Sequence, residues 1–153
     1  MSETIVQKCI SKGVKLTDQR KIIAKVMSES FDHPDVNELY LRVTKLDAKI
    51  SIATVYRTVK LFEEAGIITK HDFKGGKARY EEVSEGHHDH LIDVNSGEII
   101  EFVDDEIEKL QKKVAEKYGY DLVDHKLELY GIKKKIIVNA KKNIYKNIWL
   151  SNE

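Results

Sequence analysis

The sequence contains a single cysteine, Cys9, among its 153 residues. One thiol excludes an intrachain disulfide. It also excludes a structural zinc site built from the thiolates of one chain, because such sites commonly need two to four cysteines. No apolar run approaches the roughly 20 residues that a membrane-spanning helix needs, and the N-terminal residues MSETIVQKCISKG lack the apolar core of a secretion signal. We therefore expect a cytoplasmic protein with no membrane interaction.

The chain also has no net charge at pH 7, because its 26 Lys and Arg residues are balanced by 26 Asp and Glu residues. The balance is uneven along the chain: residues 1–83 carry 15 basic and 12 acidic residues, whereas residues 84–153 carry 11 and 14. The excess of basic residues near the N-terminus suits contact with phosphate groups. On charge alone, a solvated helix face is the favoured explanation. A chain of 153 residues is expected to form one or two small domains.

The first half predicts helices followed by a hairpin. A short helix is expected over residues 1–12, and Thr17, Asp35 and Ser51 are candidate N-caps of three further helices. The segments IITKHDF and ARYEEV then change to the period of strands and flank a Gly-Gly turn. This order is the outline of a winged helix.

The last of these helices, SIATVYRTVKLFEEAG, is typical of a DNA-reading helix. Its buried stripe is expected to be Val55, Val59 and Phe62. Its exposed first turns are expected to carry Thr54, Tyr56, Arg57 and Thr58. Recognition helices meet base edges with their N-terminal residues, where arginine can bond guanine through two donors. A winged helix with a purely structural role is the alternative that these features leave open.

The second half predicts a small α/β unit. The segments HHDHLIDV and EIIEFV form a strand pair, Asp104 caps the helix DDEIEKLQKKVAEKYG, and YDLVDHKLELYGI alternates as a further strand. A unit of this size buries little surface alone, so we expect it to dimerise. The predicted fold class is α+β: a winged-helix domain over residues 1–83, whose last helix favours DNA binding, then a small α/β domain over residues 84–153 that is expected to dimerise.

The run His87-His88-Asp89-His90 is the strongest chemical signal. Side chains alternate along a strand, so His88 and His90 point one way while His87 and Asp89 point the other. One segment can therefore supply ligands to two separate metal sites. Glu101, on the neighbouring predicted strand, lies within reach of the first pair.

Glu108 and His125 are candidate partners for the second pair, whereas His71, flanked by charged residues, is expected to be exposed. Imidazole and carboxylate ligands without sulfur suit Fe²⁺, Mn²⁺, Zn²⁺ or Co²⁺, and the order of affinities does not choose among them. Such a site could also serve a metal-dependent hydrolase, or a protein that stores metal. The sequence contains no HExxH helix, nucleophile elbow or glycine-rich phosphate loop, so we do not expect an enzyme.

In several stretches the chain closely resembles the ferric uptake regulator family. They are GVKLTDQR, ISIATVYRTVKLFEEAGII, RYEE, HHDHLIDVNSGEIIEF and YGYDLVDHKLELYGI, in family order and extending to about Ile132. The combination of ATVYRTV with HHDHL is very specific. The resemblance implies a metal-responsive transcriptional regulator, a homodimer that represses iron-uptake genes by binding A/T-rich palindromic DNA. Pairing of dimers into tetramers is left open.

The resemblance also implies roles for individual residues. The metal-sensing site would consist of His33, Glu81, His88, His90 and Glu101. A second metal site would consist of His87, Asp89, Glu108 and His125. Tyr56 and Arg57 match the base-contacting positions, and Lys15 matches a lysine expected in the minor groove.

The branch of the family is indicated by the ligand types. Glutamate at positions 81 and 101 favours the sensors of ferrous iron, whereas peroxide sensors typically carry aspartate at one or both positions, and zinc sensors rely more on cysteine. Zinc, manganese and peroxide sensing remain alternatives within the family. Many members carry a Cys-x-x-Cys after the histidine run, where this chain has Asp93 and Ser96. We therefore expect no structural zinc site built from four cysteines.

Overall fold

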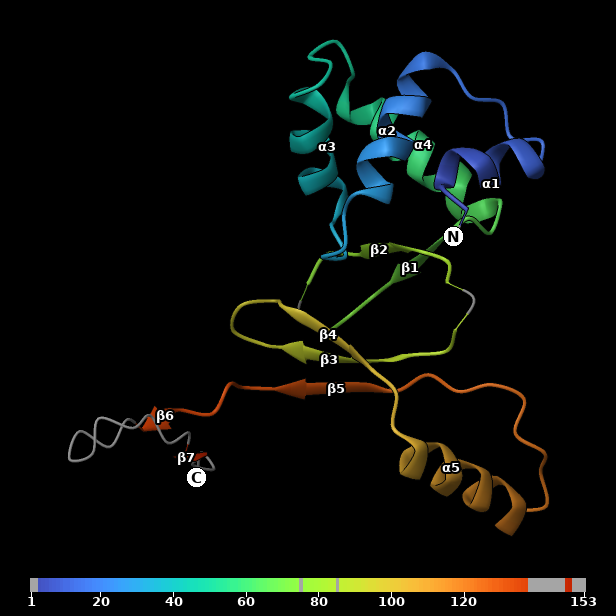
Figure 1. Ribbon diagram of the computed structural model, residues 1–153, viewed down its shortest axis with the longest axis vertical. Helices are drawn as coiled ribbons and strands as arrows, with labels where there is room; N and C mark the ends of the chain where they lie inside the picture. Colours follow the sequence, from blue (N-terminus) through green and yellow to red (C-terminus); the bar gives the residue numbers. More distant parts are fainter. Residues whose placement is uncertain (1–2, 75, 85, 138–147, 150–153) are drawn as a thin grey trace. The chain divides into compact units, whose positions relative to one another are not determined.

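The computed structural model describes residues 3–74, 76–84, 86–137 and 148–149. Contacts divide the chain into two compact units, residues 1–87 and residues 88–153. Figure 1 traces the chain through the elements of both units. The functional division expected after Val83 stays a prediction. Among the described residues, no helix has the length and apolar character needed to cross a membrane.

The N-terminal unit begins with four helices, α1 (Ile5–Ser11), α2 (Asp18–Ser28), α3 (Val36–Thr44) and α4 (Ile52–Glu64). The three N-caps predicted from the sequence are confirmed. The side chains of Thr17, Asp35 and Ser51 each accept a hydrogen bond from the backbone N–H three residues later. Helix α1 begins later than expected, because Thr4 and Gln7 form a capping box that fixes its start.

The predicted hairpin follows α4 as β1 (Ile68–His71) and β2 (Arg79–Glu82). Its antiparallel register pairs Thr69 with Glu81 and His71 with Arg79. Directly paired residues share a face of a sheet, and side chains alternate along each strand. These four side chains therefore lie on one face of the hairpin, with His71 and Glu81 as diagonal neighbours.

One hydrophobic core joins the four helices to the hairpin. Its most deeply buried members are Ile5, Cys9, Ile23, Ala24, Leu39, Val43, Ile50, Val55, Val59, Phe62, Ile67 and Ile68. Burial of a side chain such as Phe62 contributes about 1.5–3 kcal/mol relative to leaving it exposed. The predicted stripe of Val55, Val59 and Phe62 is confirmed as the inner face of α4, so the orientation of α4 is set by this core.

The C-terminal unit is a small sheet with one helix. Its elements are β3 (Asp89–Asp93), β4 (Ile99–Phe102), α5 (Asp105–Lys117), β5 (Glu128–Gly131), β6 (Ile136–Ile137) and β7 (Ile148–Trp149). Strand β3 is central, antiparallel to β4 and parallel to β5. Strands β6 and β7 pair with each other. The predicted N-cap of α5 is confirmed, because Asp104 accepts from the N–H groups of Glu106 and Ile107.

The prediction of one strand over the whole of YDLVDHKLELYGI is wrong for the first part of that segment. Strand β5 covers only Glu128–Gly131, and residues 120–127 are irregular. The reason is the length of the pairing partner, since the register with β3 runs from His90 opposite Glu128 to Asp93 opposite Gly131. Alternation of side chains cannot form a strand where no neighbouring strand is present to accept its hydrogen bonds. Val123, expected on the strand, is 95% exposed.

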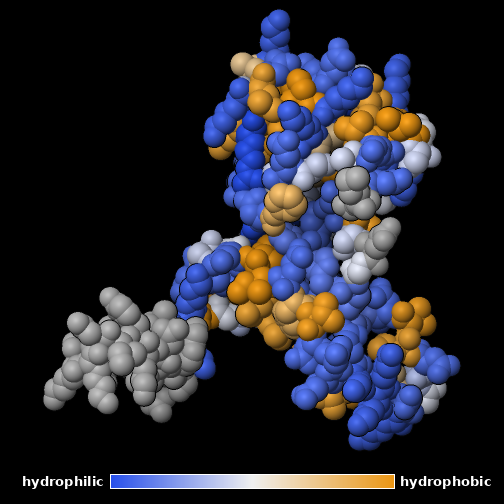
Figure 2. Space-filling view, viewed as in Figure 1, coloured by the Kyte–Doolittle hydropathy of each residue, from blue (hydrophilic) through white to orange (hydrophobic). Residues whose placement is uncertain are grey.

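The C-terminal unit leaves much of its apolar surface exposed. Among the described residues of this unit, Ile92 is the one hydrophobic residue that is buried, and helix α5 contains no buried residue. Leu110 and Val114, at helical spacing on α5, are 58% and 57% exposed. Hydrophobic residues are coloured orange on the molecular surface in Figure 2. Exposed apolar area of this kind is typical of surfaces that contact another molecule.

Candidate metal centres and recognition helix

Helix α4 presents polar and aromatic side chains on its outer face. Tyr56 is 54% exposed, and Arg57 is also exposed. The Nη2 atom of Arg57 lies 3.5 Å from Oγ1 of Thr54, one turn earlier. Thr58 was expected on this face but is buried, because it lies beside Val55 and Val59 on the inner stripe. The face that remains has an aromatic ring beside a guanidinium near the N-terminus of the helix, which suits contact with base edges.

Lys15 lies in the segment between α1 and α2, and its side chain is exposed. Its backbone is fixed, since the Lys15 carbonyl accepts a 2.7 Å hydrogen bond from Nη1 of Arg20. Lys74 and Lys77, in the segment between β1 and β2, are exposed as well. The N-terminal unit thus offers cations from its loops in addition to α4, and such cations suit phosphate contact.

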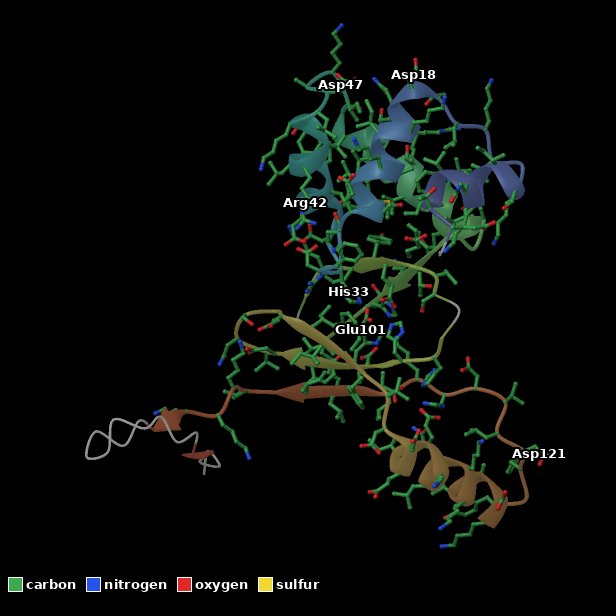
Figure 3. All side chains as sticks on the ribbon, in the orientation of Figure 1. Asp18, His33, Arg42, Asp47, Glu101 and Asp121 are labelled. Carbon is green, nitrogen blue, oxygen red and sulfur yellow. The ribbon has the colours of Figure 1, made fainter. Side chains whose placement is uncertain are left out.

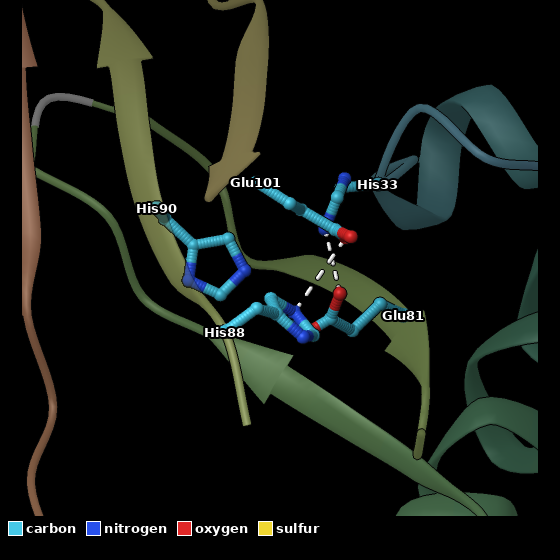
Figure 4. A group of neighbouring side chains, drawn as sticks. All are labelled: His33, Glu81, His88, His90 and Glu101. Atoms are coloured by element: carbon cyan, nitrogen blue, oxygen red, sulfur yellow. Dashed lines mark hydrogen bonds and ion pairs between the residues drawn. The ribbon is translucent and has the colours of Figure 1, made fainter. Parts of the chain in front are cut away.

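His33 and Glu81 meet within the N-terminal unit. The Nε2 atom of His33 lies 2.7 Å from Oε2 of Glu81, and Figure 4 marks this contact with a dashed line. His33 comes from the segment between α2 and α3, and Glu81 from β2. The hairpin and the helices therefore bring an imidazole nitrogen and a carboxylate oxygen together, and both atom types bind divalent metals.

The backbone of His33 adopts a conformation that is uncommon for a residue with a Cβ atom. Its φ is 53°, in the left-handed region. Arg79 stabilises this conformation, because its Nε donates to the carbonyl oxygen of His33 and its Nη2 donates to that of Asp32 at 2.8 Å. The local structure thus fixes the direction from which the His33 ring approaches Glu81.

A second arginine fixes the same segment. Both Nη atoms of Arg42, labelled in Figure 3, bond the carboxylate of Asp32, at 2.8 and 2.5 Å. The hydrogen bonds from Arg42 hold the pKa of the Asp32 carboxyl below its ordinary value. Arg42 also donates to Ser30 at 3.0 Å. The residues that precede His33 are therefore tied to α3.

His71 is buried, and its expected exposure is wrong. It is 7% exposed, its ring stacks on Phe73 with centroids 5.2 Å apart, and its Nε2 lies 2.5 Å from Oε1 of Glu81. Its flanking charges misled the sequence interpretation, because Lys70 and Asp72 are exposed while His71 between them is buried. The hairpin register, which pairs Thr69 with Glu81, is the signal that would have found this contact.

His88, His90 and Glu101 gather within the C-terminal unit. The register of β3 and β4 places Glu101 opposite His90, and Nε2 of His88 lies 3.5 Å from Oε1 of Glu101. The two imidazole rings have centroids 4.9 Å apart. Each residue offers a ligand atom within 4.8 Å of those of the other two. Figure 4 labels all three, with a dashed line between His88 and Glu101.

A second group of ligands lies within the same unit. Nε2 of His125 lies 3.3 Å from Oδ1 of Asp89 and 3.4 Å from Oε1 of Glu108. Asp89 is the first residue of β3, Glu108 lies in the first turn of α5, and His125 precedes β5. Asp89 is 1% exposed. A buried carboxylate beside an imidazole and a second carboxylate has the donor chemistry of a divalent metal site.

The turn after β3 is closed by a carboxylate. Oδ1 of Asp93 accepts hydrogen bonds from the backbone N–H of Asn95 at 2.8 Å and of Ser96 at 3.3 Å. The bond from Asn95 contributes most to a pKa of Asp93 below its ordinary value. Gly97 completes the turn with a φ of 75°. The one thiol of the chain lies elsewhere, because Cys9 is fully buried in the N-terminal core.

Known proteins resemble this chain over most of its length. The model of the ferric uptake regulator family matches residues 11–130. A ferric uptake regulation protein of Rhizobium leguminosarum bv. viciae is 57% identical over 132 residues, which are 86% of this chain and 93% of that protein.

Solved structures agree with this resemblance. A zinc-bound manganese uptake regulator aligns with a TM-score of 0.77 and 56% identity, covering 86% of this chain and 99% of that one. The ferric uptake regulator of Vibrio cholerae aligns with a TM-score of 0.74 and 42% identity, covering 83% and 98%. They support the predicted α+β fold with a winged-helix domain and a small dimerisation domain. The chain belongs to the ferric uptake regulator family, whose members are metal-responsive DNA-binding regulators of transcription.

Proposed function

We propose that this protein is a ferrous-iron-responsive repressor of iron-uptake genes that acts in the cytoplasm as a homodimer on A/T-rich palindromic DNA. Residues 1–83 serve as the DNA-binding domain and residues 84–153 as the dimerisation and metal-binding domain. The observation that carries the proposal is that imidazole and carboxylate ligands gather in both units, while the N-terminal unit also presents Tyr56 and Arg57 on α4.

The sensing site that we propose takes ligands from both halves of the chain. His33 and Glu81 supply one imidazole and one carboxylate, and their ligand atoms already lie 2.7 Å apart. His88, His90 and Glu101 supply two imidazoles and one carboxylate from the C-terminal unit. Fe²⁺ and Mn²⁺ accept such mixed nitrogen and oxygen ligands. A bound ion would attract both sets of ligands at once. Without the ion, this link between the two sets would be missing.

The mechanism follows from linking the two halves. One ion bound by ligands from both halves favours one angle between the two halves. It thereby favours one spacing of the two α4 helices in a dimer. Metal shifts the population toward that arrangement if it binds there more tightly than elsewhere. The dimer then meets successive half-sites of a palindrome, since the symmetry of the operator mirrors that of the protein.

His87, Asp89, Glu108 and His125 form the second metal site in our proposal. Asp89, Glu108 and His125 come from β3, from α5 and from the segment before β5. Metal there would join three separate segments of a unit that has little apolar core. Its role is therefore to stabilise the C-terminal unit, and binding there would raise its free energy of unfolding by mass action.

Homodimerisation is supported by the exposed apolar surface of the C-terminal unit. Leu110 and Val114 line one side of α5. An apolar groove on the sheet is lined by Leu91, Ile92, Ile100 and Ile132 together with Asp93, Glu98, Gly131 and Lys133. A small unit gains the buried area that it lacks by pairing this surface with a second copy.

Manganese is the second candidate for the sensed metal. The observation that favours it is the 56% identity to a manganese uptake regulator, nearly equal to the 57% identity to a ferric uptake regulation protein. Ligand types do not separate the two ions, because Fe²⁺ and Mn²⁺ are neighbours in the order of affinities. Zinc sensing through thiolates is disfavoured by the single, buried Cys9.

Fluorescence anisotropy on a labelled A/T-rich palindromic duplex tests the proposal. At fixed salt, which phosphate contacts require, we expect a gain in affinity of about 5- to 150-fold with metal relative to chelator. Titration with Fe²⁺ under anaerobic conditions and with Mn²⁺, each at buffered free concentration, ranks the two ions. Equal binding with metal and with chelator would contradict the proposed sensing, and the absence of binding in both states would contradict DNA recognition.

A further inference from the structure

We propose that His71 is a positioning residue that determines which oxygen of Glu81 faces the sensed metal. This inference rests on the proposed sensing site, in which Glu81 is a ligand and His71 is not. His71 is buried on the same hairpin face as Glu81. Its side chain is therefore available to act on the metal through Glu81.

The two oxygens of Glu81 have different imidazole partners. Oε1 lies 2.5 Å from Nε2 of His71, and Oε2 lies 2.7 Å from Nε2 of His33. A carboxylate accepts hydrogen bonds and donates none, so Nε2–H of His71 donates to Oε1. A donor on Oε1 leaves Oε2 directed toward His33, the other ligand of this unit. Glu81 is thus oriented to bind an ion through a single oxygen.

The His71 ring is itself fixed in place. It stacks on Phe73 with an angle of 8° between the planes, and Phe73 is buried. The ring lies edge-on to that of His33, with centroids 6.3 Å apart. The stack sets the direction of the Nε2–H bond before any metal binds, so the orientation of Glu81 is prepared in advance. Ligands prepared in this way lose less conformational freedom on binding.

Positioning by His71 is separate from the contacts that fix His33. Arg79 bonds the backbone carbonyl of His33, whereas His71 bonds the side chain of Glu81. Loss of the His71 donor would free Glu81 to rotate, to bind the ion through both oxygens, or to leave it. Hydrogen-bond partners of metal ligands typically contribute about 10–100-fold to metal affinity, so we expect an effect of that size.

Two substitutions separate the hydrogen bond from the stacking. His71→Phe keeps a ring against Phe73 but removes the donor, and His71→Gln keeps an N–H donor but removes the ring. Lys70→Ala, at the neighbouring and exposed position of β1, is the matched control for changes to the hairpin. Co²⁺ is the probe, because the intensity of its visible bands depends on the number of ligands. His33→Ala in the same titration defines the part of the spectrum that belongs to the sensing site.

We expect His71→Phe to weaken Co²⁺ binding at that site by about 10–100-fold and to change the intensity of its bands. We expect His71→Gln to restore much of both, and Lys70→Ala to match the wild type. A His71→Phe protein with the wild-type affinity and spectrum would overturn the positioning role while leaving the sensing site intact. If His33→Ala also leaves the Co²⁺ spectrum unchanged, the assignment of the sensing site fails, and the role of His71 fails with it.

Discussion

Nε2 of His33 lies 2.7 Å from Oε2 of Glu81 although 48 residues separate them in the sequence. The contact ties the segment before α3 to the second strand of the hairpin, and both belong to the N-terminal unit. Two of the five ligands of the proposed sensing site are therefore brought together by the folding of the N-terminal unit alone. Metal need not order these two ligands, and its binding free energy can act on the arrangement of the two halves instead.

Replacing Arg57 with alanine should weaken binding to the operator by about 1–3 kcal/mol and reduce the preference for operator over random DNA, because a guanidinium on a recognition helix can bond a base edge through two donors. Anisotropy with operator and scrambled duplexes measures both effects. Lys60→Ala is the control, since Lys60 is an exposed cation on the same helix. Its loss should weaken binding to both duplexes similarly. Unchanged affinity of Arg57→Ala would show that Arg57 does not read DNA.

Val114→Glu should shift the protein from dimer to monomer. Val114 is 57% exposed on α5, and its burial against a second copy contributes about 1.5–3 kcal/mol. A symmetric interface loses this contribution twice. Sedimentation velocity over a range of concentrations measures the change, and Lys113→Glu, also exposed on α5, is the matched control. A dimer of wild-type strength in Val114→Glu would place the interface on another surface.

Asp32→Asn should lower the free energy of unfolding by up to about 1 kcal/mol at pH 7, the range for a solvent-exposed ion pair. Arg42 holds the pKa of Asp32 below its ordinary value of 3.8. The stabilisation is thus present above pH 3.8 and is lost as the pH falls through the lowered pKa. Urea unfolding of both proteins from pH 7 to pH 3 should show the difference shrinking at acid pH. In an Arg42→Met background the difference should be small throughout, and a difference that persists there would have another cause.

Cys9 should react with Ellman's reagent only when the protein opens. The thiol is fully buried, and burial raises its pKa, so the reactive thiolate is disfavoured. We expect a reaction roughly 10³-fold slower than in urea-unfolded protein, since opening the core costs several kcal/mol. Protein purified with EDTA should likewise release no zinc on unfolding in a colorimetric assay. Rapid labelling of the folded protein would contradict this placement of the thiol. Tightly held zinc would contradict the expected absence of a structural zinc site built from thiolates.

The features predicted well from the sequence are those that depend on residues close together in the chain. Thr17, Asp35 and Ser51 cap their helices through bonds to the third following residue, so local pattern suffices. The exposure of His71 and the start of β5 were predicted wrongly, because they depend on strand register and on the length of a distant partner strand. The contact of His33 with Glu81 has no local signal, and only the family resemblance indicated that these two residues act together.

A double-mutant cycle on His33 and His90 most directly tests whether one metal ion is bound by both halves. The measured quantity is the gain in affinity for an A/T-rich duplex on adding Mn²⁺, at fixed salt, for wild type, His33→Ala, His90→Ala and the double variant. If the two side chains bind the same ion, each single variant abolishes the gain and the double variant loses no more than either. If each single variant retains part of the gain and the losses add, the two histidines serve independent sites, and the proposed coupling between the halves is wrong.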